Sequence, residues 1–117
     1  MARVLVVNDD PDLLMMVKIV LESAGFEVEI ASEGAALEAT VHRFEPEILV
    51  LDWVLEDATG GEVLAHLDGC AVCRPRVLVI SALDRVAPLA KILGAEAFLR
   101  KPFTAEELIE AVRRVGA

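Results

Sequence analysis

Aromatic residues are scarce in this sequence: four phenylalanines and one tryptophan make up 4% of the 117 residues, and tyrosine is absent. Because 56% of the residues are hydrophobic, the core must consist mainly of Val, Leu, Ile and Ala, as is typical of a sheet covered by helices. Basic residues are also few, 11 against 20 acidic ones, which gives a net charge of −9. A surface this negative repels phosphodiester backbones and anionic lipid, so this chain is not expected to bind nucleic acid or membrane directly.

Long hydrophobic runs are missing as well. The N-terminal run at residues 4–7 is too short for the core of a signal peptide and leads directly into Asn8, Asp9 and Asp10. No other segment approaches the length of a transmembrane helix. We therefore expect a cytoplasmic protein.

Only two cysteines are present, Cys70 and Cys73, in a single C-x-x-C pair. A redox motif of this kind opens a helix after a strand, whereas this pair precedes a predicted strand. A zinc site needs two further ligands, and His42 and His66 are too isolated to supply them. Two ordinary thiols are the simpler interpretation.

Short apolar runs alternate with helical patterns along the whole chain. The runs predict strands at residues 3–7, 26–31, 48–52, 76–80 and 96–99, the second of them alternating like an edge strand. The helical patterns cover residues 11–24, 33–43, 62–67 and 83–93, and a last helix follows Thr104 nearly to the C-terminus. This order predicts one α/β domain, residues 1–117, with a doubly wound parallel sheet.

Two helix starts are marked clearly in the sequence. Asp10 followed by Pro11 is a typical N-cap with proline at the first helical position, and Gly25 ends that helix. Thr104 and Glu107 have the spacing of a capping box.

Polar residues stand at or just after the ends of four predicted strands: Asn8, Asp9, Asp10, Asp52, Ser81 and Lys101. All carboxyl ends of a parallel sheet share one edge, so these residues should gather there. Two carboxylates about 4 Å apart repel by about 4 kcal/mol at an effective dielectric of about 20, and therefore need a cation between them. Without His or Cys at the strand ends, Mg²⁺ is favoured over zinc.

This combination predicts a metal-assisted phosphoryl site with a carboxylate nucleophile. Asp52 is the best candidate, because it ends the central strand beside an irregular stretch at residues 53–61. Asp9 would hold the metal opposite it, and the backbone carbonyl of Val54 would complete the ligand set. Ser81 would hydrogen-bond one phosphoryl oxygen, and Lys101 would neutralise another.

Four motifs in order resemble the receiver domain of two-component response regulators, including the chemotaxis regulators. They are Val-Leu-Val-Val-Asn-Asp-Asp-Pro at residues 4–11, Leu-Asp-Trp-Val-Leu at 51–55 through Gly60, Val-Ile-Ser-Ala at 79–82, and Phe-Leu-Arg-Lys-Pro-Phe at 98–103. The resemblance implies a flavodoxin-like sheet of order 2-1-3-4-5 with five helices. It also implies that Asp52 receives a phosphoryl group, with Mg²⁺ or Mn²⁺, from a histidine kinase or phosphotransfer protein.

The resemblance further implies how the signal leaves the site. Ser81 and Phe98 would move together on phosphorylation, and the Lys101–Pro102 peptide bond would be cis, which aims the lysine. The output would be a downstream protein or output domain, with a phosphorylation-dependent dimer as one alternative. Such a chain catalyses only its own phosphorylation and dephosphorylation and is not otherwise an enzyme.

The sequence departs from the family pattern at several places. Asn8 is an amide where the family usually has a carboxylate, so Mg²⁺ should bind more weakly, with Asn8 acting through a metal-bound water. Asp10 has two interpretations, since its N-cap role alone would explain it and a water-mediated metal contact is the alternative. Glu56 replaces a frequent proline, and Leu83 stands where polar residues are common.

Three functions fit these observations to different degrees. The first is a phosphorylation-controlled switch whose output surface is the fourth helix, fifth strand and fifth helix. The second is a phosphate-independent interaction module, which Asn8 makes credible. The third, a phosphatase with an aspartyl intermediate, would need a second acid two residues after Asp52, and Val54 stands there instead.

Overall fold

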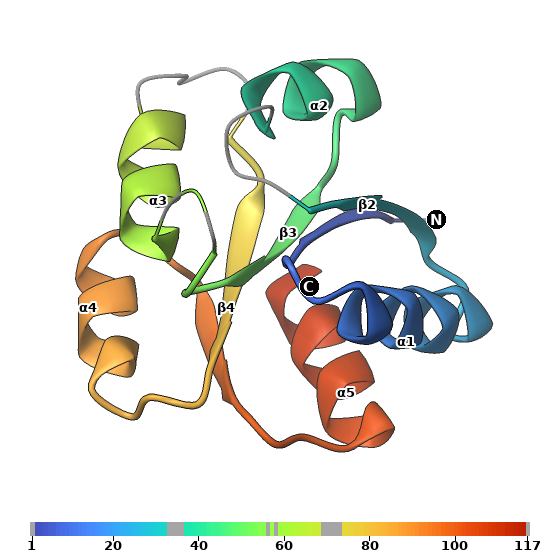
Figure 1. Cartoon of the computed structure of the whole chain (residues 1–117). Coiled ribbons are helices and arrows are strands. Elements are labelled where there is room, and N and C mark those ends of the chain that lie inside the picture. The colour runs from blue at the N-terminus through green and yellow to red at the C-terminus, as the bar shows by residue number, and fades with distance from the viewer. Residues whose placement is uncertain (1, 33–36, 56, 58, 69–73, 117) are drawn as a thin grey trace.

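The computed structural model describes residues 2–32, 37–55, 57, 59–68 and 74–116, in which five strands and five helices alternate (Figure 1). The strands are β1 (Arg3–Val7), β2 (Glu27–Ala31), β3 (Ile48–Asp52), β4 (Arg76–Ser81) and β5 (Ala97–Arg100). The helices are α1 (Pro11–Ser23), α2 (Leu37–Phe44), α3 (Gly60–Asp68), α4 (Val86–Ile92) and α5 (Ala105–Gly116). None of these helices is both long and apolar enough to cross a membrane. Glu56, Cys70, Cys73 and the side chain of His66 lie outside the described residues.

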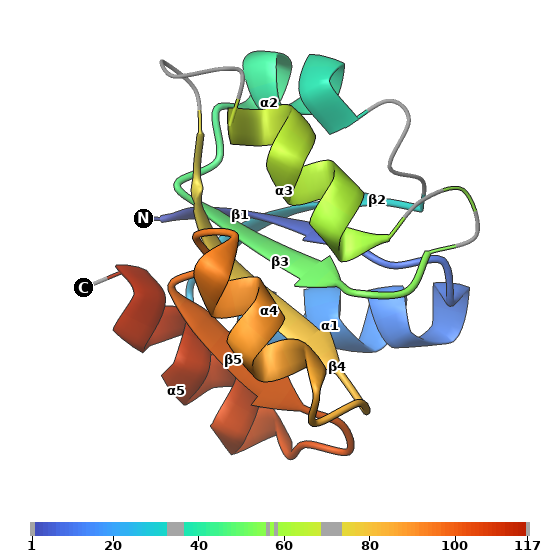
Figure 2. The same ribbon diagram turned by 90° about the vertical axis from the view of Figure 1, so that its left-hand side faces the viewer.

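The described strands form a parallel sheet in the order β2-β1-β3-β4-β5. The central strand, β3, pairs with β1 and β4, whereas β2 and β5 are the edges. Helices α1 and α5 cover one face of the sheet, and α2, α3 and α4 cover the other (Figures 1 and 2). The predicted strand order, the doubly wound arrangement and the edge position of β2 are therefore confirmed.

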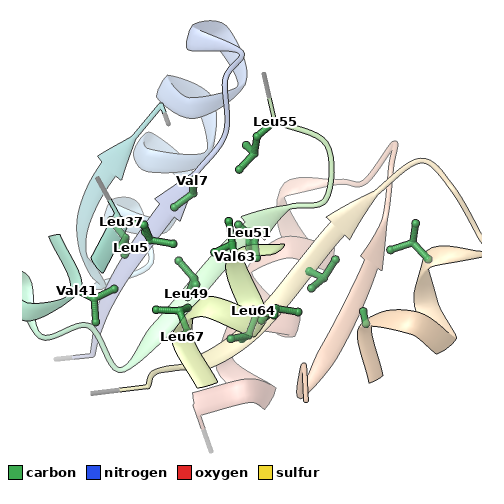
Figure 3. Close-up of a cluster of buried hydrophobic side chains, with 14 residues drawn as sticks. Leu5, Val7, Leu37, Val41, Leu49, Leu51, Leu55, Val63, Leu64 and Leu67 are labelled. Atoms are coloured by element: carbon green, nitrogen blue, oxygen red, sulfur yellow. The ribbon is translucent and has the colours of Figure 1, made fainter. Parts of the chain in front are cut away.

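The sheet divides the core into two layers, because alternate residues of each strand point to opposite faces. In β1, Leu5 and Val7 pack with the layer under α2, α3 and α4 (Figure 3). Val4 and Val6 pack with the layer under α1 and α5. A strand buried on both faces has no polar position, which explains the uninterrupted apolar runs in the sequence.

Helix α1 begins and ends as predicted. Oδ1 of Asp10 accepts hydrogen bonds from the backbone N–H groups of Asp12, at 3.0 Å, and Leu13, at 3.4 Å. After the helix, Gly25 has a φ of 97°, which an L side chain rarely adopts.

Two helices begin with capping boxes. In α5 the predicted one is present: Oγ1 of Thr104 accepts from the N–H of Glu107 at 3.1 Å, and the Glu107 carboxylate accepts from the N–H of Thr104 at 2.9 Å. Thr59 and Glu62 make the same reciprocal pair at the start of α3, at 3.2 and 3.3 Å. The predicted start of α3 at residue 62 is therefore wrong by two residues, because this unrecognised capping box starts the helix at Gly60.

Arginines bind helix C-termini at the edge of the sheet where the strands begin. Arg74 donates to the carbonyls of Leu93 and Gly94, which follow α4, at 3.3 and 3.0 Å. Arg76 donates to the carbonyl of Val115 in α5 at 3.0 Å. Carbonyl groups at the C-terminal end of a helix lack the N–H partner that the next turn would supply, and these arginines provide one. They also place positive charge at the negative end of the helix dipole.

Candidate functional site

The buried polar side chains of the described residues lie at the opposite edge of the sheet, where the strands end. They are Asn8, Asp52 and Ser81, with exposed fractions of 4%, 6% and 3%. Asp52 and Ser81 are the last residues of β3 and β4, and Asn8 directly follows β1. Buried polar groups need hydrogen-bond partners, so the contacts of these three side chains define the candidate site.

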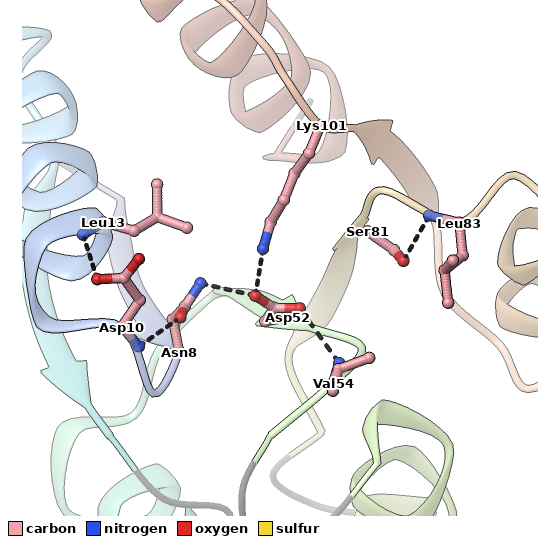
Figure 4. A network of polar contacts seen from close by, with 8 residues as sticks. All are labelled: Asn8, Asp10, Leu13, Asp52, Val54, Ser81, Leu83 and Lys101. Atoms are coloured by element: carbon pink, nitrogen blue, oxygen red, sulfur yellow. Dashed lines mark hydrogen bonds and ion pairs between the residues drawn. The ribbon is translucent and has the colours of Figure 1, made fainter.

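Among the described residues, three donors form hydrogen bonds to Asp52 (Figure 4). Its Oδ2 lies 2.5 Å from Nζ of Lys101 and 2.8 Å from Nδ2 of Asn8. Its Oδ1 accepts from the backbone N–H of Val54 at 3.2 Å. The carboxylate is thus paired with a positive charge, and both of its oxygens are engaged.

Strand register explains why Asn8 and Asp52 meet although they are 44 residues apart in sequence. Val7 pairs with Leu51, so Asn8, which follows Val7, lies beside Asp52, which follows Leu51. Both side chains alternate onto the sheet face that α1 and α5 cover, together with Val6 and Val50.

Lys101 reaches the site from farther away. It directly follows β5, which is separated from β3 by β4. Leu99, two residues earlier, packs in the layer under α1 and α5, so alternation places Lys101 on the same face as Asp52. A side chain as long as lysine is needed to cross the intervening strand. The Lys101–Pro102 peptide bond is cis.

The amide of Asn8 has a defined orientation. Its Oδ1 accepts from the backbone N–H of Asp10 at 2.8 Å, and its Nδ2 donates to Asp52. The reversed amide would place an oxygen against the carboxylate and an NH₂ group against the N–H of Asp10. The hydrogen-bond network therefore allows one orientation, with the donor toward Asp52.

The acidic residues predicted to bind a cation lie at the same edge of the sheet. Asp9 is partly exposed, whereas Asp10 is exposed and caps α1. Among the described residues, no three His, Cys, Asp or Glu side chains form a group that could hold a metal ion. The possible metal ligands at this edge are oxygen atoms, from the carboxylates of Asp9 and Asp52 and the backbone carbonyl of Val54. Such a set fits a hard divalent ion that keeps several of its waters.

Ser81 and Phe98 lie on the other face of the sheet. Phe98 is partly buried against the layer under α2, α3 and α4, and Ser81 alternates onto the same side as Val79. Val79 and Phe98 are paired in register, so the serine and the aromatic ring are near neighbours on adjacent strands. The hydroxyl of Ser81 accepts from the N–H of Leu83 at 3.0 Å (Figure 4).

Two residues that follow β3, Trp53 and Val54, contact Thr59 and Gly60 where α3 begins. The N–H of Gly60 donates to the carbonyl of Trp53 at 2.6 Å, and Val54 and Thr59 form an antiparallel bridge. The Trp53 indole packs against Gly60, where an added Cβ would lie 2.9 Å from Cε3 of the ring. The only tryptophan of the chain is therefore held next to Asp52.

Two contacts of Asp52 were not predicted from the sequence. The bond from the Val54 N–H is an Asx-type turn, which an aspartate followed by an irregular stretch could have indicated. The bond from Asn8 had no sequence signal, because the direction of an amide depends on its neighbours in space.

Comparison with known proteins identifies relatives over nearly the whole chain. The model of the response regulator receiver domain matches residues 4–113. The transcriptional regulatory protein TrcR of Mycobacterium tuberculosis is 37% identical over 114 residues, which make up 95% of this chain and 44% of that protein. A response regulator receiver domain from Bermanella marisrubri has a TM-score of 0.90 at 31% identity, covering 98% of both chains.

A further solved structure, the chemotaxis response regulator CheY4 of Vibrio cholerae, has a TM-score of 0.87 at 28% identity, again over 98% of both chains. The chain spans about half the length of the curated relatives it matches, between 44% and 49% for the first three. The matched region includes all of the candidate site residues, Asn8, Asp9, Asp10, Asp52, Val54, Ser81, Phe98 and Lys101. This chain therefore belongs to the family of response regulator receiver domains.

Proposed function

We propose that residues 1–117 form one receiver domain in which Asp52 accepts a phosphoryl group from a histidine kinase or a phosphotransfer protein in the cytoplasm. The observation that carries this proposal is the Asp52 carboxylate, 6% exposed at the end of the central strand, with the Lys101 ammonium 2.5 Å away. A buried ion pair contributes little to stability compared with an apolar pair of similar volume, so its presence favours a chemical role.

In the proposed transfer, a lone pair on Oδ1 of Asp52 attacks the phosphorus of a phosphohistidine. A bond from phosphorus to oxygen forms, the bond from phosphorus to nitrogen breaks, and the imidazole leaves with the electron pair and takes up a proton. Oδ1 is the better nucleophile because it accepts one hydrogen bond, whereas Oδ2 accepts two.

Two side chains would stabilise the phosphoryl group. Lys101, already at Asp52, neutralises one of its oxygens. The hydroxyl of Ser81 accepts from Leu83, which leaves its own hydrogen available for donation to a second oxygen once the side chain turns toward Asp52. Asp52 and these two residues account for the chain's own phosphorylation and dephosphorylation chemistry.

The donor oxygens at this edge suit Mg²⁺ or Mn²⁺. Asp9, Asp52 and the backbone carbonyl of Val54 would hold the ion, and Asn8 and Asp10 are the further residues within reach of its waters. Bound there, the cation would neutralise charge on the transferring phosphoryl group.

Phosphorylation would reach the output surface through Ser81 and Phe98. Movement of Ser81 toward Asp52 would vacate space on the sheet face that Phe98 shares, and the ring would follow it. The surface changed in this way, formed by α4, β5 and α5, would then bind a downstream protein, an attached output domain or a second copy of the chain. TrcR is a transcriptional regulator, and we propose that any nucleic-acid contact is made outside this acidic domain.

A second function is favoured by one specific contact. Because Asn8 donates to Asp52, a neutral side chain of the protein itself stabilises the carboxylate. A domain of this kind can present its α4-β5-α5 surface permanently and signal by docking alone, without phosphate.

Intact-mass measurement decides between these functions. The folded chain is incubated with Mg²⁺ and a small phosphodonor such as acetyl phosphate, with Asp52→Ala as the control. A phosphoacceptor gains the mass of one phosphoryl group, and the control does not. A folded wild type that gains no mass would support the docking function, and equal gains in both proteins would show that Asp52 is not the acceptor.

A further inference from the structure

The carboxylate of Asp52 has few free lone pairs. Two oxygens offer about four lone-pair sites. Within the described residues, Lys101, Asn8 and the N–H of Val54 occupy three of them. One site therefore remains, on Oδ1.

The proposed function needs two sites on the same carboxylate. Oδ1 must attack phosphorus, and another lone pair must be offered to the divalent cation. One of the three donors therefore has to withdraw when the cation binds.

Asn8 is the donor best placed to withdraw. Lys101 carries a charge and forms the stronger bond, at 2.5 Å. The N–H of Val54 belongs to the backbone, which is held by the antiparallel bridge to Thr59. Asn8 is neutral, and its side chain can rotate away without movement of a strand.

We infer that Asn8 acts as a positioning residue that occupies, in the ion-free domain, a lone pair of Asp52 that the divalent cation requires. This inference rests on the proposed function, because it assumes that Asp52 uses both a cation and a nucleophilic oxygen. The Asn8 amide holds Oδ2 in the resting state, and its withdrawal accompanies cation binding.

Competition by the amide and a missing negative charge at residue 8 have different consequences for Mg²⁺ binding. A simple loss of charge at residue 8 would weaken Mg²⁺ binding equally for asparagine and for any other neutral residue. Competition by the amide predicts that asparagine is worse than a neutral residue without a donor. As long as Oδ1 of Asn8 accepts from Asp10, the group facing Asp52 is a donor, which cannot bind a cation-bound water that also donates.

Mg²⁺ titrations of the wild type, Asn8→Ala and Asn8→Asp distinguish competition by the amide from a simple loss of charge. Fluorescence of Trp53 is the readout, and no phosphodonor is present. Asn8→Ala removes the donor without adding charge, and Asn8→Asp adds charge and serves as the positive control. We expect Asn8→Ala to bind Mg²⁺ about tenfold more tightly than wild type, since a hydrogen bond to a charged group is lost from the competing state. Equal or weaker binding by a folded Asn8→Ala protein would overturn the inference.

A second measurement uses the wild-type protein and does not depend on any variant folding. Asn8 is the only asparagine and the chain has no glutamine, so a ¹⁵N–¹H correlation spectrum contains one side-chain carboxamide pair. We expect this pair to shift and to exchange faster with water as Mg²⁺ is added. An unchanged pair at metal concentrations that saturate the backbone signals of Asp9 and Trp53 would overturn the inference, and so would the absence of Mg²⁺ binding in wild type and both variants.

These outcomes are independent of phosphoryl transfer. A wild type that binds Mg²⁺ with release of Asn8 but gains no phosphoryl mass would refute the proposed function and leave the role of Asn8 intact. The converse result, transfer to Asp52 with an unmoved amide, would refute the role of Asn8 alone.

Discussion

The ammonium of Lys101 lies 2.5 Å from Oδ2 of Asp52, and so joins the end of β5 to the end of β3 across the intervening strand. The Asp52 side chain is 7% exposed and that of Lys101 is 29% exposed. Loss of either partner would therefore leave the other charge unpaired at a site that is partly shielded from solvent.

Replacement of Lys101 by methionine should destabilise the domain, because it leaves the buried Asp52 charge without its cationic partner. We expect a loss of about 1–3 kcal/mol in the free energy of unfolding, measured by urea denaturation, less than for a fully buried pair because Lys101 is partly exposed. Lys91→Met, at an exposed lysine of α4, is the matched control and should change stability little. Equal stabilities of the two variants would show that the ion pair has no structural role.

Two substitutions at Asp10 separate its capping role from a contact with the cation. Asp10→Ala should lower stability by about 1 kcal/mol, because α1 loses the side chain that accepts from Asp12 and Leu13. Asp10→Asn keeps a capping oxygen and removes the charge, so its thermal midpoint should stay close to that of wild type. Since Asp10 is exposed, we expect Asp10→Asn to weaken Mg²⁺ binding by at most about twofold. A much larger loss would assign the Asp10 carboxylate to the cation.

The two adjacent glycines at the start of α3 should respond differently to alanine. A Cβ at Gly60 would lie 2.9 Å from Cε3 and 3.0 Å from Cα of Trp53, whereas one at Gly61 would approach only the far edge of the indole and Leu93, at 3.3 Å or more. Gly60→Ala should therefore destabilise by about 1–3 kcal/mol and change the fluorescence of Trp53. Gly61→Ala is the control, and similar losses of stability in both variants would indicate that the close approach of Trp53 to Gly60 is not the cause.

Strands β1, β3 and β4 were predictable because each is buried on both faces and reads as a nearly unbroken apolar run, whereas β2 was predictable from its alternation. Their order followed from the family resemblance and was confirmed by the sheet. The site could be predicted as a gathering of strand-end residues, because parallel strands place their carboxyl ends at one edge. Asn8, Asp52 and Lys101 meet there as expected.

Other features depend on details that a sequence pattern does not carry. The start of α3 was misplaced because the capping box that Thr59 forms with Glu62, in the first turn of the helix, was not recognised. The donation from Asn8 to Asp52 depends on the N–H of Asp10 facing the amide oxygen, which only the three-dimensional arrangement defines.

The identity of the acceptor is tested most directly by chemical trapping. Borohydride reduces an acyl phosphate to the alcohol, so a phosphorylated aspartate is converted to homoserine and can be located by peptide mass spectrometry. After treatment with a phosphodonor and Mg²⁺, we predict homoserine at position 52 in the wild type. We predict no homoserine at any position in the Asp52→Ala variant. Homoserine at Asp9 or Asp10, or a phosphoryl group that borohydride does not remove, would contradict the assignment of Asp52 as the acceptor.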